Sequence, residues 1–353
     1  MRSSVIWRWR WLVGVALAAL AVYWVWHVHR EQLGFDWHRF TATFLQVKLE
    51  WLLAASVLSI LSFYGRALRW AEMMRPLGRV PRMYEIFSAT AIGFTAIVLF
   101  GRPAELVRPY LISLRGAVPF TSQIAIWLLE RIYDLLIVLI LFGFGVAGIR
   151  QSGVEVGPRI EGMLRVAGYS VGILCALALG ILFCLREFSE PMQRRLVESL
   201  AFLPEHWQSR VDQVAGSFVR GVASTKEHRA LALVVFYSCI EWAIILLSYA
   251  ALFQAIPAVS ALSVSDILIF LGLVSFGSIV HLPGGGGGAQ IASVVVLVEL
   301  FRLPLEVASG ITIFVWIVAV AVIVPVGAVM AVQQGLGWRR LKSMRQLEAG
   351  AAL

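Results

Sequence analysis

FGRPAELVRPY, residues 100–110, places three charged side chains (Arg102, Glu105 and Arg108) directly behind a Gly-Arg-Pro break. Long apolar runs flank it, residues 86–100 before and residues 124–148 after. The whole chain is 59% hydrophobic and only 14% charged, whereas soluble domains are about 25% charged. This composition is typical of membrane proteins, so the three charges are expected to lie at or within a bilayer rather than in an ordinary water-exposed loop.

Membrane-spanning helices account for most of the remaining sequence. A span needs about 20 apolar residues to cross a hydrocarbon core of about 30 Å. Six segments meet or approach this length: 11–28, 51–64, 124–148, 166–185, 231–253 and 305–332. Two shorter apolar stretches, 84–100 and 266–282, end in glycine and proline. The expected fold class is therefore all-α, a polytopic transmembrane helix bundle.

Basic residues between the spans indicate the orientation, because cytoplasmic loops carry an excess of Lys and Arg. Such residues number three in 1–10, five in 65–82, seven in 186–230, four in 333–353 and none in 254–265. The first four segments, both termini included, are expected in the cytoplasm and the last one outside. The predicted location is multi-pass in the cytoplasmic (inner) membrane of a bacterium.

This orientation conflicts with a complete span at 84–100, because residues 186–230 would then lie outside. The conflict disappears if 84–100 enters from the cytoplasm, turns at 101–103 and returns through 105–118. Such a re-entrant hairpin is allowed where protein or a water-filled cavity surrounds it. A second hairpin, 266–303, is broken by a proline and five glycines at 283–288 and enters from the opposite face. Two complete short spans fit the second segment equally well.

The two hairpins divide the chain into related halves. We expect a first transmembrane helix and an interfacial segment in 1–50, a first half-repeat (span, hairpin, span) in 51–148, a connecting span and a cytoplasmic amphipathic segment in 149–230, a second half-repeat in 231–332, and a basic cytoplasmic tail in 333–353. The halves have opposite orientation. Inverted repeats with helices broken near the midplane form the binding sites of many secondary transporters.

Charged side chains inside a membrane cost at least about 2.5–3.5 kcal/mol and are candidates for function. Arginine forks match phosphate oxygens, and glycine-rich turns expose backbone N–H groups. The candidate substrate-binding residues are Gly101, Arg102, Glu105, Arg108, Glu130, Arg131, Asp134, Glu241, Pro283, Gly284, Gly285, Gly287 and Gln290. Arg102 and Arg108 would hold a phosphate, with acids as counter-charges. The alternative, a purely structural network of ion pairs, stays open.

Other residues suggest no further chemistry. Arg66, Arg69 and Trp70 are expected to anchor the cytoplasmic end of the second span. The three cysteines lack metal-ligand spacing, so we predict no metal, cofactor or catalytic residue. The net charge of +9 is attributed to topology and to anionic lipid head groups rather than to nucleic acid.

Four motifs in order carry a family resemblance: Arg66-x-x-Arg69-Trp70, Gly101-Arg102-x-x-Glu105-x-x-Arg108, Glu130-Arg131-x-x-Asp134, and Pro283-Gly-Gly-x-Gly287. Over about residues 40–332 the chain resembles the lysylphosphatidylglycerol-synthase transmembrane family of flippase-like proteins. That resemblance implies a membrane domain that moves lipids, here without the family's aminoacyl-transferase domain. The family favours glutamate where this chain has Gln290, which puts proton coupling at the second hairpin in doubt.

The function expected is binding and translocation of an anionic phospholipid or a polyprenyl-phosphate lipid across the membrane. In this role Glu241 is a proton-linked or a structural acid. Two alternatives remain: a membrane-embedded transferase that acts on a lipid phosphate, and a non-catalytic partner that docks a cytosolic lipid-modifying enzyme through 186–230.

Overall fold

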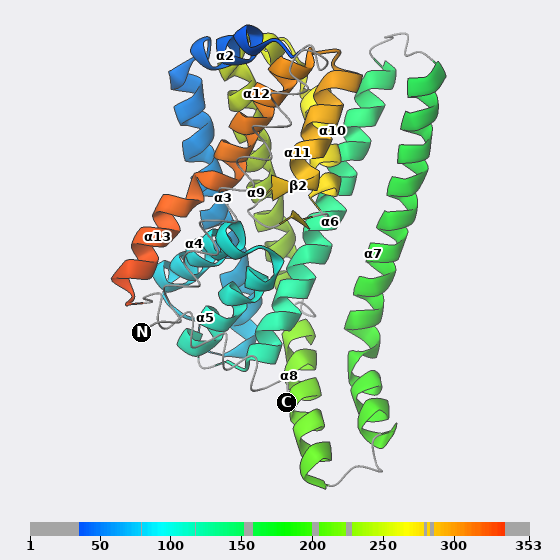
Figure 1. Cartoon of the computed structure of the whole chain (residues 1–353). Coiled ribbons are helices and arrows are strands. Elements are labelled where there is room, and N and C mark those ends of the chain that lie inside the picture. Colours follow the sequence, from blue (N-terminus) through cyan, green and yellow to red (C-terminus); the bar gives the residue numbers. More distant parts are fainter. Residues whose placement is uncertain are drawn as a thin grey trace, which may run out of the picture.

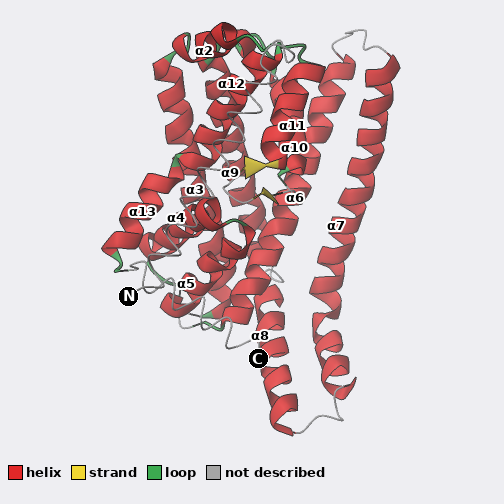
Figure 2. Cartoon of the chain, in the orientation of Figure 1, coloured by secondary structure: helices red, strands yellow, loops and turns green. Residues whose placement is uncertain are grey.

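The computed structural model describes residues 35–78, 80–116, 118–151, 158–199, 205–223, 228–278, 281–282 and 286–335. The expected first span at 11–28, residues 283–285 of the second break and residues 336–353 of the tail lie outside this part. The described chain is almost entirely helical, which confirms the all-α class (Figure 2). Its strands, β1 (His281–Leu282) and β2 (Gly286–Gly287), are two residues long each.

Long helices form the frame of the molecule. They are α3 (Leu49–Met74), α6 (Phe120–Gln151), α7 (Pro158–Ser199), α9 (His228–Ala255) and α12 (Leu305–Trp316), which continues through a π-helical turn, η5 (Ile317–Ala321), into α13 (Ile323–Gln333). The shorter α2 (Trp37–Leu45) and α8 (Glu205–Ala223) lie at opposite ends in Figure 1. Four stretches of the described residues are long and apolar enough to cross a membrane: Leu49–Leu77, Met83–Phe100, His228–Ala255 and Leu305–Gln333.

The first hairpin follows α3. Helix α4 (Met83–Phe100) ends at Gly101, whose φ of 78° reverses the chain. A 3-10 turn, η2 (Arg102–Leu106), then leads into α5 (Val107–Gly116), which packs against α4. The predicted break at Gly101 is therefore present. Because α4 also has the length of a span, its return to the same side of the membrane stays a prediction.

The second hairpin consists of α10 (Val264–Gly277), the β1–β2 pair and α11 (Gly288–Val295), which continues as a π-helical turn, η4 (Val296–Leu300). His281 lies opposite Gly287 in the antiparallel pair. Figure 1 shows α4 and α5 in the lower half of the bundle and α10 and α11 in the upper half. The two hairpins thus approach the middle from opposite ends. Their inverted-repeat relation stays a prediction.

The two largest hydrophobic cores each lie mainly in one half of the chain, and smaller clusters join the halves. Trp70, Ile112 and Leu129 belong to a core between α3, α4, α5 and α6. Phe253 and Phe270 belong to a second core between α9, α10, α11 and α12. Helices α3 and α9 pack against each other along their length and join the two halves. The space between the hairpin tips lies beside this central pair, and it holds the candidate site.

Candidate functional site

Seven charged side chains meet where α3, α5, α6 and α9 come together. We call them the charged cluster: Arg66, Arg69, Arg108, Arg131, Glu130, Asp134 and Glu241. Four arginines face three carboxylates, so with all groups ionised the cluster of described residues carries one positive charge in excess. Five of the seven are buried, namely Arg69, Arg108, Glu130, Asp134 and Glu241, and buried ion pairs are expected only where every member has partners.

Arg69 is the centre of the cluster and is fully buried. Its Nη2 donates to Glu130 Oε1 at 2.8 Å, and its Nη1 donates to Asp134 Oδ1 at 2.7 Å and to Ser238 Oγ at 3.0 Å. Glu241 Oε2 lies 3.4 Å from the same Nη1. One guanidinium therefore connects both acids of α6 with α9, and its role is to hold the helices together.

Arg108 supports the cluster from the hairpin side. Its Nη2 lies 2.9 Å and 3.0 Å from the two carboxylate oxygens of Glu130. Its guanidinium carbon lies 3.9 Å from the ring centroid of Trp70, a cation–π contact. The Trp70 indole donates to the buried Gln123 at 2.9 Å. Arg108 thus fixes α5 against α3 and α6.

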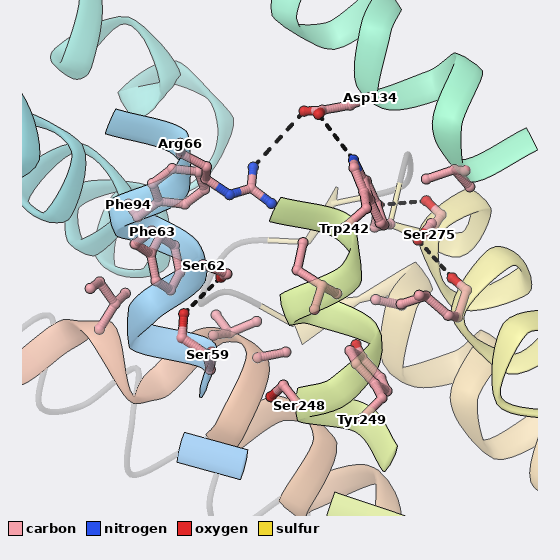
Figure 3. A pocket seen from close by; sticks show the side chains of 18 of the residues that line it. Ser59, Ser62, Phe63, Arg66, Phe94, Asp134, Trp242, Ser248, Tyr249 and Ser275 are labelled. Carbon is pink, nitrogen blue, oxygen red and sulfur yellow. Dashed lines mark hydrogen bonds and ion pairs between the residues drawn. The ribbon is translucent and has the colours of Figure 1, made fainter. Parts of the chain in front are cut away.

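The two carboxylate oxygens of Asp134 contact different members of the cluster. Oδ1 accepts from Arg69 and, at 3.3 Å, from the Trp242 indole N–H. Oδ2 faces Arg131 at 3.3 Å and Arg66 at 3.9 Å. Figure 3 shows Asp134 between Arg66 and Trp242. The first oxygen is part of the buried framework, whereas the second offsets the charge of the two more accessible arginines.

Glu241 is fully buried and lies between two guanidinium groups. Its Oε1 is 3.1 Å from Arg66 Nε and its Oε2 is 3.4 Å from Arg69 Nη1. Arg66 also lies 5.2 Å from the ring centroid of Phe94 on α4. Arg66 therefore contacts both halves of the chain, because α3 and α4 belong to the first half and α9 to the second.

A cavity of about 470 Å³ adjoins the cluster (Figure 3). Arg66, Arg131 and Asp134 form its charged wall. The other walls combine apolar and hydroxyl-bearing side chains: Ser59, Ser62, Phe63, Phe94, Ile97, Val98, Leu135, Val138, Trp242, Ile245, Ser248, Tyr249, Leu271, Ser275, Phe276, Ser278, Ala289, Gln290, Ala319, Val320 and Ile323. Both hairpins and the π-helical turn η5 contribute to this lining, so a movement of either half changes the cavity.

The serines of the cavity leave acceptor capacity toward its interior. Ser62, Ser248 and Ser275 donate their hydroxyl hydrogens to backbone carbonyls at 2.7, 2.8 and 2.6 Å. A hydroxyl oxygen that donates its hydrogen keeps two lone pairs. Sites for small molecules are mostly apolar with a few polar groups that fix orientation. These hydroxyl oxygens can accept hydrogen bonds from a polar ligand, whereas the donors for an anionic group in this cavity are the arginines.

The expected substrate-binding residues separate into distinct locations. Arg131, Asp134 and Gln290 line the cavity. Arg108, Glu130 and Glu241 belong to the cluster behind it. The remaining candidates are Gly101 at the break, a half-buried Glu105, Gly287 in β2, Arg102, whose side chain lies outside the described part, and Pro283, Gly284 and Gly285, also outside it. Arg108, which was expected to hold a phosphate, is buried and contacts Glu130 and Trp70 rather than the cavity.

The assignment of Arg66, Arg69 and Trp70 as membrane anchors is also corrected. Arg69 and Trp70 are fully buried, and the side chain of Arg66 is 14% exposed and paired with Glu241. The acidic partners of the two arginines lie on α6 and α9, far away in the sequence. From the sequence alone, an arginine at the end of an apolar run therefore looks like a residue at the membrane interface.

The hydroxyl side chains and Trp242 were not expected from the sequence to line the site. One available signal was a polar stripe on α3: Ser59, Ser62, Arg66 and Arg69 follow one another at helical spacing of three or four residues. Such a stripe in an apolar span marks a face turned toward protein or a cavity. Among the residues described, no group of three or more His, Cys, Asp or Glu side chains is placed to hold a metal ion.

Comparisons with known proteins agree with the sequence motifs. The family model described as the lysylphosphatidylglycerol synthase TM region matches residues 11–327. Glycosyltransferase AglD of Haloferax volcanii is 31% identical over 101 residues, which are 28% of this chain and 16% of that protein. No solved structure matches the chain. Together, the family match and the span-length helices show that the chain is a multi-pass membrane protein that belongs to the lysylphosphatidylglycerol synthase TM region family.

Proposed function

We propose that the chain binds the head group of an anionic phospholipid or a polyprenyl-phosphate lipid in the cavity and translocates it across the bacterial inner membrane. The observation that carries this proposal is the charged wall of the cavity. Arg66 and Arg131 line the space together with one carboxylate, Asp134, and mostly apolar or hydroxyl-bearing side chains, and the cluster to which they belong has one positive charge in excess. An anion is the ligand that balances this charge.

Arginine suits the task because its planar fork binds two phosphate oxygens at once. Arg131 is the more accessible of the two, with a side chain that is 40% exposed. Asp134 Oδ2 contacts both arginines, so an incoming phosphate displaces a carboxylate rather than water alone. This competition weakens binding and allows release, which transport requires. The roles proposed here differ from those expected from the sequence: Arg66 and Arg131 hold the phosphate, and Arg69, Arg108, Glu130 and Glu241 maintain the framework.

The lining by both hairpins supports translocation rather than static binding. Ile97 and Val98 come from α4, and Ala289 and Gln290 come from α11. The hairpins also pack across the two halves, α4 against α13 and α10 against α6, so a movement between the halves is transmitted to both hairpins. A rocking of one half against the other along the α3–α9 pair would open the cavity first to one face and then to the other, as in alternating access.

A vesicle assay tests the proposal. The purified protein is reconstituted with phosphatidylglycerol that carries a fluorescent head-group-proximal label, and dithionite then bleaches the outer leaflet. Protein-free vesicles protect the inner-leaflet half of the signal. We expect protein-containing vesicles to lose most of it, because labelled lipid moves outward. Protection equal to that in protein-free vesicles, for both phosphatidylglycerol and a polyprenyl phosphate, would contradict translocation.

The same vesicles distinguish the transferase alternative, which the name of the archaeal relative suggests for that protein. Mass spectrometry of the recovered lipid is expected to show an unchanged mass after translocation. A new lipid mass that forms only with the protein and a donor substrate would assign the cavity to a transferase instead.

A further inference from the structure

The cavity has a charged end and a hydroxyl end. Its charged end is formed by Arg66, Arg131 and Asp134. The side chains of the hydroxyl end are neutral and carry O–H groups: Ser59, Ser62, Ser248 and Tyr249. Figure 3 shows Ser248 and Tyr249 on the opposite side of the cavity from Arg66 and Asp134. Among the described residues, no further Asp or Glu side chain lines the space. A phosphate at the charged end therefore leaves the hydroxyl end for another part of the ligand.

Helix geometry gives the distance between the two ends. On α3, Ser62 and Ser59 precede Arg66 by four and seven residues. At a rise of about 1.5 Å per residue, they lie about 6 and about 10 Å from Arg66 along the helix axis. Helix α9 runs in the opposite direction: Glu241 contacts Arg66, and Ser248, seven residues later, donates to the α3 backbone at 2.8 Å. The hydroxyl groups thus follow the arginine at distances that suit one glycerol or one hexose attached to a phosphate.

The hydroxyl end can both accept and donate hydrogen bonds. Ser62 and Ser248 donate their hydrogens to backbone carbonyls and keep lone pairs for a ligand. Ser59 and Tyr249 differ, because none of the described residues accepts the hydrogen of either hydroxyl group. A hydroxyl group on a ligand matches this combination, since it donates one hydrogen bond and accepts up to two.

An ammonium group matches the hydroxyl end less well. It donates but cannot accept, so the hydrogens of Ser59 and Tyr249 would stay unpaired. A charge removed from water also needs an opposite charge nearby, and the carboxylate of the lining, Asp134, already faces Arg66 and Arg131. A phosphate without a head group leaves the hydroxyl end without any partner. Lipids of both kinds are therefore disfavoured relative to a lipid with a hydroxyl-bearing head group.

We propose that the ligand of the cavity is a phosphodiester lipid whose head group is an uncharged polyol, a glycerol or a hexose, with its phosphate at the charged end and its polyol at the hydroxyl end. This inference rests on the proposed function and specifies the head group of its substrate. A site that hydrogen-bonds the hydroxyl groups of a substrate discriminates against analogues that lack them, because its own polar groups then stay unpaired. The selection is thus made by hydrogen bonding and charge rather than by size.

A comparison of head groups on identical chains tests the proposal. Wild-type protein is reconstituted with phosphatidylglycerol, phosphatidylethanolamine or phosphatidic acid, each with the same fluorophore on one acyl chain, and dithionite bleaches the outer leaflet. A second series compares a polyprenyl-phosphoryl hexose with the polyprenyl phosphate, both labelled at the far end of the prenyl chain. In at least one series we expect the polyol lipid to move at least about tenfold faster than its counterparts, and that series identifies a phospholipid or a glycolipid as the source.

The remaining outcomes separate this inference from the proposed function. Lipids without hydroxyl groups that move as fast as the polyol lipid, or faster, in both series would overturn the polyol head group. Absence of movement for every lipid would instead contradict translocation itself.

A matched pair of double variants supplies the second readout. Ser59→Ala/Tyr249→Phe removes two hydroxyl groups of the hydroxyl end and breaks no hydrogen bond between described residues. We expect the rate for the polyol lipid to fall at least about fivefold, with unchanged rates for the other lipids and an unchanged melting temperature. Ser56→Ala/Tyr237→Phe makes the same chemical changes on α3 and α9 outside the cavity lining and should keep the wild-type preference. A Ser59→Ala/Tyr249→Phe protein that keeps the wild-type ratio of rates would overturn the selection of the head group by these hydroxyl groups.

Discussion

At the scale of single residues, the arginines of the charged cluster have different tasks although their chemistry is the same. Arg69 and Arg108 are buried and donate their hydrogen bonds to Glu130, Asp134 and Ser238. Arg66 and Arg131 face the cavity. The difference follows from position: the first pair lies between helices, where an unpaired charge is costly, and the second pair lies at an accessible wall.

Arg69→Met tests the structural task. Removing one partner from a buried ion-pair network costs about 3–5 kcal/mol, because the remaining charges lose their compensation. We expect a large fall in melting temperature, measured in detergent, and loss of the folded protein at 37 °C. The matched control is Arg39→Met, since the side chain of Arg39 is 63% exposed and its ionic partner among the described residues is Asp36, three positions away. Surface pairs contribute about 0–1 kcal/mol, so this change should be nearly silent. Equal stability of the two variants would contradict a structural role for Arg69.

Asp134→Asn tests the competition at the cavity wall. The amide oxygen can still accept from Arg69 and Trp242, but the negative charge opposite Arg66 and Arg131 is gone. We expect co-purified phosphate lipid to be retained several-fold more strongly, and translocation to be slower because release is impaired. Lipid retention is quantified by phosphorus analysis after detergent exchange. Weaker retention in a variant that melts like wild type would show that Asp134 assists the ligand rather than competing with it.

At the scale of elements, the first hairpin depends on a close approach between α4 and α5. A Cβ atom on Gly93 would lie 2.7 Å from the Cβ atom and 3.3 Å from the backbone of Arg108. Glycine therefore lets the hairpin close far enough for Arg108 to reach Glu130 and Trp70. Small residues at helix contacts serve the same purpose in many membrane proteins.

Gly93→Ala is expected to destabilise the protein by about 1–3 kcal/mol, the range for overpacking in a close-packed interior. Gly143→Ala is the control, because a Cβ atom on Gly143 of α6 has no neighbour within 4 Å. Replacing that helical glycine should be neutral or stabilising by up to about 1 kcal/mol. Melting temperatures of both variants in one detergent give the comparison. A Gly93→Ala variant as stable as Gly143→Ala would mean that α5 is free to move away.

The sequence predicted the elements better than it predicted their partners. The break at Gly101 was visible because glycine and proline interrupt an apolar helix, and the structure has it at that residue. Arg69 was assigned to the membrane edge because an apolar window ends at the first arginine. Its helix continues to Met74, and its partners Glu130 and Glu241 are on other helices. Pairing between distant segments has no local sequence signal, so the buried cluster became apparent only in three dimensions.

At the scale of the whole molecule, the two hairpins approach the cavity from opposite ends of the bundle (Figure 1). The helix frame, its breaks and the family were predictable from hydropathy, Gly and Pro positions and ordered motifs. The shape of the cavity was not, because its lining comes from α3, α4, α6, α9, α10, α11, η5 and α13 together. Side chains such as Tyr249 acquire their position from packing across the halves.

Cysteine labelling tests the orientation. Cysteines at Arg75 and Ser209 should react only with reagents that reach the cytoplasm, and a cysteine at Ala258, on the opposite end, only from outside. All three positions are exposed. The basic residues of 65–82 and 186–230 predict this distribution. Reaction at Ser209 from outside would make 83–100 a complete span and remove the re-entrant hairpin.

The translocation rate of Arg66→Lys is the most direct test of the charged cavity wall as a phosphate site. Lysine keeps the positive charge opposite Glu241, so the fold should remain, but it loses the fork that binds two phosphate oxygens. In vesicles with fluorescent phosphatidylglycerol, we expect the initial rate to fall at least about tenfold while the melting temperature stays within a few degrees of wild type. Arg39→Lys should move lipid at the wild-type rate. An Arg66→Lys protein that translocates lipid as fast as wild type would contradict a role for this arginine in binding the head group.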